Sequence, residues 1–141
     1  MGLDNGITLI TRQKLTEHDI PPYIHIDIDD WEDEHDNRGY HYEICYWRKC
    51  WNIRSIVFDI NDNAIDNGIF ELDMKHVYQL EQKITEYIVD IQKWQDDYEG
   101  GRTIWDADDM LPHLAQDVVN LQWLENYMKK HRAIVEFYDS Y

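Results

Sequence analysis

Two stretches near the N-terminus have the residue pattern of β-strands. Residues 7–12 are rich in β-branched side chains, and residues 24–29 alternate isoleucine with His and Asp. Alternation with a period of two is typical of a strand that buries one face. Pro21 and Pro22 interrupt the chain between these two predicted strands. We expect residues 30–37 to form a polar, acidic loop.

Residues 40–60 carry large side chains at helical spacing on two opposite faces. One face holds Ile44, Trp47, Trp51, Ser55 and Phe58. The opposite face holds Tyr46, Cys50, Ile53, Val57 and Ile60. Because a helix that is apolar on all sides is buried, we predict a central helix between two layers, with Trp47 and Trp51 in the core.

A second helix is predicted over residues 74–98, after a short strand over residues 69–72. Asp73 is placed to cap the start of this helix, and Gly100-Gly101 ends it. Its core stripe consists of Val77, Leu80, Ile84, Ile88 and Ile91. Its polar surface is expected to hold ordinary ion pairs among Lys83, Glu86, Asp90, Lys93 and Asp97.

A third helix is predicted to begin between residues 108 and 112 and to run to about residue 131. Pro112 suits a first helical turn. The core face of this helix consists of Leu114, Val118, Leu121 and Met128. Residues 133–138 form a last strand. This order of elements predicts a single α+β domain over residues 1–141, with three main helices packed on a small, largely antiparallel sheet.

Acidic residues outnumber basic residues by more than two to one. The chain has 29 Asp and Glu and 13 Lys and Arg, so its formal net charge is -16. This charge repels nucleic acid and anionic membranes. We therefore expect basic proteins or cations as partners, although solubility alone is a simpler reason for the charge. No transmembrane stretch or signal peptide is visible in the sequence.

An acidic segment lies between residues 27 and 36 and contains no Lys or Arg. Its seven carboxylates, selected here as candidate partner-binding residues, are Asp27, Asp29, Asp30, Glu32, Asp33, Glu34 and Asp36. Three interpretations are open: a solvated loop, a mimic of a phosphate backbone that occupies a basic groove, or a Ca²⁺ or Mg²⁺ site. The spacing does not match an EF-hand.

His25, Asp27 and Asp29 would share one face of the predicted strand over residues 24–29. With His35 or His41 they could form a transition-metal site, whereas the simpler interpretation is a polar outer face. The chain has no nucleophile motif and no phosphate-binding glycine loop. We therefore assign no catalytic residue, no cofactor and no metal.

Basic side chains stand among the aromatic residues of the predicted central helix, namely Arg48, Lys49 and Arg54. They could stack on and neutralise a nucleotide, or they could pair with acidic neighbours of the same chain. A second small basic cluster consists of Lys129, Lys130 and Arg132. Cys45 and Cys50 are expected to be reduced and unlinked, because five residues along a helix place them apart.

Two short motifs resemble a group of small phage and prophage proteins. They are Met1-Gly2-Leu3-Asp4 and, in the predicted central helix, Tyr46-Trp47-Arg48-Lys49. In that group Asn-x-Ile-His follows the second motif, and here Arg54 replaces the histidine. The order of the later elements and the Tyr-rich end of the chain are also similar. The resemblance implies a phage origin and the cytoplasm of a bacterial host, and it implies no particular reaction.

Size, charge and resemblance together predict an acidic interaction protein that inhibits a host defence system acting on nucleic acid. The expected partner is a basic surface of a host nucleic-acid-binding protein or defence nuclease, as for an anti-CRISPR or anti-restriction inhibitor that works by steric or charge mimicry. The alternative is a metal-dependent phosphoesterase or nucleotide-processing enzyme built on the strand with His25. A role in phage assembly and a homo-oligomeric state are also open.

Overall fold

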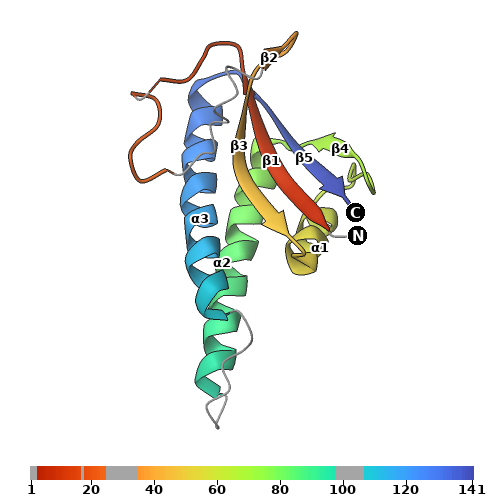
Figure 1. Cartoon of the computed structure of the whole chain (residues 1–141), viewed down its shortest axis with the longest axis vertical. Coiled ribbons are helices and arrows are strands. Elements are labelled where there is room, and N and C mark those ends of the chain that lie inside the picture. The colour runs from red at the N-terminus through yellow and green to blue at the C-terminus, as the bar shows by residue number, and fades with distance from the viewer. Residues whose placement is uncertain (1–2, 17, 25–34, 98–106) are drawn as a thin grey trace.

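Five strands and three helices make up the computed structural model, which describes residues 3–16, 18–24, 35–97 and 107–141 (Figure 1). In chain order they are β1 (Asp4–Thr11), β2 (His35–Asp36), β3 (Gly39–Arg48), α1 (Trp51–Ile60), β4 (Ile69–Glu71), α2 (Met74–Asp97), α3 (Ala107–Lys130) and β5 (Ile134–Ser140). The protein therefore has the predicted α+β fold, with three helices packed on a small antiparallel sheet.

The sheet has the strand order β2-β3-β1-β5-β4, and every neighbouring pair is antiparallel. The first strand, β1, lies at the centre between β3 and β5. Asp4 at the start of β1 pairs with Ser140 at the end of β5. The first and last strands thus lie side by side, and the start of β1 lies at the same end of the sheet as the end of β5 (Figure 1).

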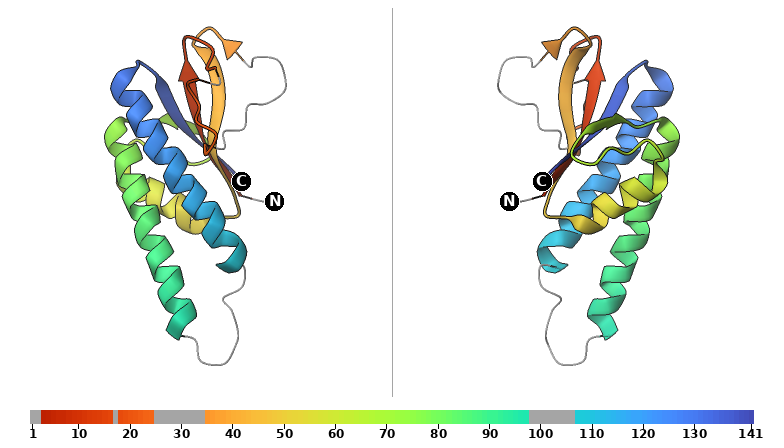
Figure 2. Two further views of the ribbon diagram at one scale, coloured as in Figure 1. Left: turned by 90° about the vertical axis from the view of Figure 1, so that its left-hand side faces the viewer. Right: turned by 90° about the vertical axis from the view of Figure 1, so that its right-hand side faces the viewer.

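The helices cover one face of the sheet, as the two side views show (Figure 2). α2 and α3 run alongside each other, and the core forms where they meet the sheet. The predicted stripe of α2 is confirmed, since Val77, Leu80, Ile84 and Ile91 are buried and Ile88 packs against the core. On α3, Leu114 and Leu121 are buried, while Val118 and Met128 are partly buried.

The prediction of one helix over residues 40–60 is wrong. Residues 39–48 form β3, a turn follows in which Lys49 has a φ of 57°, and α1 starts only at Trp51. A bulge explains the misleading pattern. The register with β1 passes from Cys45 directly to Glu43, so Ile44 is an extra residue. Because the bulge lets Ile44 and Cys45 both face inward, the buried positions recur at a spacing of three that imitates a helix.

The same correction separates the two tryptophans that we expected in the core. Trp47 lies in β3 and is 1% exposed, as expected, whereas Trp51 opens α1 and is 53% exposed. The Tyr46-Trp47-Arg48-Lys49 motif is therefore the end of a strand with its turn and does not lie in a helix.

Other boundaries differ by a few residues. α2 has the predicted start, β5 continues to Ser140, and α3 begins at Ala107, so Pro112 falls in its second turn and not its first. The predicted strand over residues 24–29 lies almost wholly outside the described residues. Within the predicted loop, His35–Asp36 form β2. No helix in the described part of the chain combines the length and apolar character needed to cross a membrane.

Candidate functional site

The acidic segment predicted to bind a partner lies mostly outside the described residues. Asp36 is the exception, and its backbone pairs with Gly39 in the two-residue ladder between β2 and β3. His25, Asp27 and Asp29 also lie outside the described residues. Among the residues that are described, no three His, Cys, Asp or Glu side chains gather as a metal site would require.

A second acidic surface, which the sequence analysis did not single out, extends from α1 to the start of α2. We call its four exposed members the α1–α2 carboxylates: Asp59, Asp62, Glu71 and Asp73. No Lys or Arg occurs between residues 55 and 74. The imidazole Nδ1 of His76 lies 4.0 Å from the Asp73 carboxylate and accepts a hydrogen bond from the backbone N–H of Asp73 at 3.0 Å. A count of charges along the sequence would have revealed this surface.

Arg54 is engaged by the protein itself. Its Nε donates to Asp139 at 2.8 Å, and one terminal nitrogen donates to Asp66 at 2.6 Å. The guanidinium also lies 4.1 Å from the centre of the Phe58 ring. Of the two interpretations of the basic and aromatic residues, internal pairing is thus confirmed for Arg54. A nucleotide has no free guanidinium to bind at this position.

Asp139 is the buried centre of that arrangement. It also accepts hydrogen bonds from the Asn5 side chain at 2.7 Å and from the Asn67 backbone at 2.9 Å. Burial alone would raise the pKa of this carboxyl, but the donors, Arg54 foremost, hold the pKa below its ordinary value. The carboxylate therefore joins β1, α1 and β5 in the folded state.

A second buried carboxylate, Asp117 on α3, accepts a hydrogen bond of 2.7 Å from the indole nitrogen of Trp47. Burial raises the pKa of Asp117 to about 6, against the opposing effect of His113, whose Nε2 lies 3.6 Å away. Asp117 also accepts a hydrogen bond from the thiol of Cys45.

These groups do not form a nucleophile site. Burial, reinforced by the charge of Asp117, raises the pKa of Cys45 well above that of an ordinary thiol, so Cys45 stays protonated and unreactive. Burial also raises the pKa of Cys50. Both cysteines are free thiols in the structure, as expected, although Cys45 lies in a strand and not in a helix.

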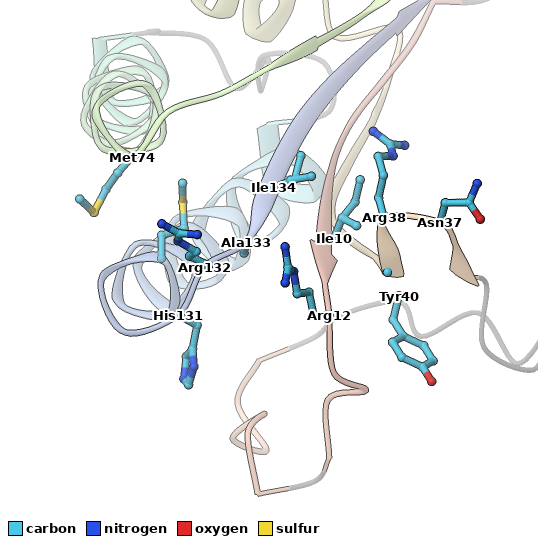
Figure 3. A pocket seen from close by; sticks show the side chains of 12 residues that line it. Ile10, Arg12, Asn37, Arg38, Tyr40, Met74, His131, Arg132, Ala133 and Ile134 are labelled. Carbon is cyan, nitrogen blue, oxygen red and sulfur yellow. The ribbon is translucent and has the colours of Figure 1, made fainter.

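A hollow of about 950 Å³ lies at the end of the sheet near the end of α3 (Figure 3). Three arginines line it: Arg12 follows β1, Arg38 precedes β3, and Arg132 follows α3. Its described lining contains no Asp or Glu. We call this feature the arginine hollow. Of these three, only Arg132 belongs to a basic cluster that the sequence predicts.

The three guanidinium groups differ in whether the protein supplies them with a partner. Arg38 donates to Glu136 at 2.7 Å. Arg12 and Arg132 are exposed, and in the part of the chain that the structure describes no ion pair or hydrogen bond is found for either side chain. His131 stacks on Tyr127 with ring centres 4.6 Å apart. Two cationic groups are thus available to an anion.

No protein family, curated protein or solved structure matches this chain.

Proposed function

We propose that this chain is an acidic interaction protein that occupies a basic surface of a nucleic-acid-handling protein. In its concrete form the proposal is a phage-encoded inhibitor of a host defence system, of the anti-CRISPR or anti-restriction type, which acts by steric or charge mimicry in the bacterial cytoplasm. The observation that carries it is the excess of carboxylates that the chain does not neutralise.

Two groups of carboxylates supply this excess. The acidic segment holds seven in sequence without a Lys or Arg. The α1–α2 carboxylates are exposed and lie on a stretch of 20 residues, 55–74, that also lacks Lys and Arg. Negative charge at the surface attracts a basic groove and accelerates encounter with it. No observation in the described residues favours the alternative, a metal-dependent phosphoesterase.

The test measures displacement of DNA. A labelled target duplex is bound to an RNA-guided nuclease or to a restriction endonuclease, and fluorescence anisotropy follows its release as the protein is added. We expect stoichiometric displacement from at least one such effector, with an inhibition that weakens as salt rises. Unchanged DNA binding and cleavage by every effector in the panel would contradict the inhibitor form of the proposal.

Charge-neutralised variants then locate the surface. One variant changes Asp29, Asp30, Glu32, Asp33 and Glu34 to Asn or Gln, and a second changes Asp59 and Asp62 to Asn. The matched control for the second changes Glu86→Gln and Asp90→Asn, which removes the same charge from α2, where Lys83 already pairs with Glu86 at 3.4 Å. Charge mimicry requires that at least one of the first two variants inhibits less than the control does.

A further inference from the structure

The arginine hollow is the strongest unassigned feature of the molecule, because its charge is opposite to that of the whole chain. The chain has six arginines, and three of them line this one hollow. Although 29 residues are acidic, none appears in its described lining. Arg38 pairs with Glu136, as Arg54 does with Asp139 and Asp66, but no such pair is found for Arg12 or Arg132 among the described residues.

We propose that the arginine hollow binds a small polyphosphate anion, such as a nucleoside triphosphate, through Arg12 and Arg132, beside Arg38, which already pairs with Glu136. This inference rests on arginines, whereas the proposed function rests on carboxylates, so the two can be tested independently. A guanidinium presents a planar fork of N–H donors that fits phosphate oxygens in pairs.

The spread of the three guanidinium groups favours a chain of phosphates over a single one. In Figure 3, Arg12 is drawn between Arg132 on one side and Arg38 on the other. Each adjoins a different element, so the hollow presents guanidinium groups at more than one point and not a single point of charge. Successive phosphate groups offer acceptors at several such points.

The backbone holds two of these arginines in place. Gly39 has a φ of 137°, which side-chain-bearing residues rarely adopt, and a Cβ at this position would overlap the carbonyl oxygen of Thr11. The start of β3 therefore presses closely on the end of β1. Because Arg38 and Arg12 adjoin the two contacting residues, this contact fixes their backbones beside each other.

The remaining lining can hold the organic part of a ligand. Met74, Met128 and Ile134 supply apolar side chains, and Met74 is 40% exposed. A volume of about 950 Å³ lies within the usual range for small-molecule pockets. The last turn of α3 opposes an anion with its partial negative charge, but Lys129 and Lys130 in that turn and Arg132 beyond it offset this effect.

The test is calorimetric titration of the full chain with inorganic triphosphate, ATP and adenosine at low ionic strength without divalent cations. We expect triphosphate and ATP to bind at one site and adenosine to bind far more weakly. Arg12→Gln and Arg132→Gln should each weaken ATP binding about tenfold or more, the effect expected when a charge-assisted pair is lost. Arg48→Gln is the matched control, since Arg48 is an exposed arginine on β3 outside the hollow.

Four results would overturn the proposal: no binding of triphosphate or ATP, equal weakening by Arg48→Gln, adenosine binding as tightly as ATP, or tighter binding of a thymidine oligonucleotide. Urea unfolding of each variant checks that the fold is kept. If a variant unfolds, amide shift perturbation in the unmodified protein replaces it, and shifts must then centre on Arg12, Arg38 and Arg132. The variant Asp59→Asn with Asp62→Asn should still bind ATP, which separates this test from that of the proposed function.

Discussion

Trp47 and Trp51 are four residues apart, and the turn between them gives them opposite environments. Lys49 adopts a left-handed conformation there, and its backbone N–H donates to the Leu3 carbonyl at 2.7 Å. This contact ties the end of β3 to the start of β1. Trp47 stays in the core beside Asp117, while Trp51 begins α1 at the surface and contacts the ring of Tyr141.

We predict that Trp47→Ala lowers the free energy of unfolding by about 3–5 kcal/mol, the range for emptying a large aromatic site. The same substitution at Trp51 should cost far less, because that side chain is already half exposed. Urea denaturation followed by circular dichroism measures both. Equal losses for the two variants would show that α1 contributes to the core through Trp51.

Asp117 makes the protein sensitive to pH in the mildly acidic range. Its folded-state pKa of about 6 exceeds its ordinary value of 3.8, so the folded state binds a proton more tightly than the unfolded state does. The stability that this proton supplies is complete below about pH 4 and is lost as pH rises through about 6. Asp117→Asn should remove this fall in the free energy of unfolding. The fall is at most about 3 kcal/mol, because the folded-state and ordinary pKa values differ by about two units.

The measurement for Asp117 is the difference in unfolding free energy between the variant and the unmodified protein, taken from pH 4 to pH 8. We expect the variant to gain relative stability across that interval. Because Asn retains an oxygen for the indole N–H of Trp47, packing should be preserved. A difference that is constant with pH would contradict the raised pKa.

At the scale of elements, what could be predicted from the sequence depended on whether one face or two carried the apolar residues. α2 has a single apolar stripe, and its position was predicted to within one residue of its end. The prediction for residues 40–60 is wrong because the bulge at Ile44 places consecutive residues of β3 in the core, and no local pattern records that β3 pairs with β1. The arginine hollow was also beyond prediction, since Arg12, Arg38 and Arg132 meet only through strand pairing and the return of α3.

Asp139 joins elements that are distant in sequence, and we predict that Asp139→Asn destabilises the protein by about 3 kcal/mol at pH 7, the low end for breaking a buried ion pair. Its pKa in the folded state is below the ordinary value, so the stabilisation is present above about pH 4 and is lost as pH falls further. Urea titrations at pH 7 and near pH 3 should therefore show a larger difference between variant and unmodified protein at pH 7.

At the scale of the whole molecule, a net charge of -16 means that repulsion among the carboxylates destabilises the folded state. We predict that sodium chloride raises the free energy of unfolding, because screening shortens the range of repulsion from about 10 Å at 0.1 M salt to about 3 Å at 1 M. Urea titrations at several salt concentrations measure this. A midpoint that falls with salt would mean that attractive pairs, such as Arg54 with Asp139, outweigh the repulsion.

The pairing of Asp4 with Ser140 gives the molecule one further property. Opposed residues of neighbouring antiparallel strands lie about 5 Å apart, so the start of β1 and the end of β5 lie close together in space. A domain with such closely spaced ends can be inserted into a surface loop of an unrelated carrier protein without separating the two ends of that loop. The start of β1 and the end of β5 lie at the end of the sheet opposite the arginine hollow. A carrier protein joined there would therefore leave the hollow accessible to ligands.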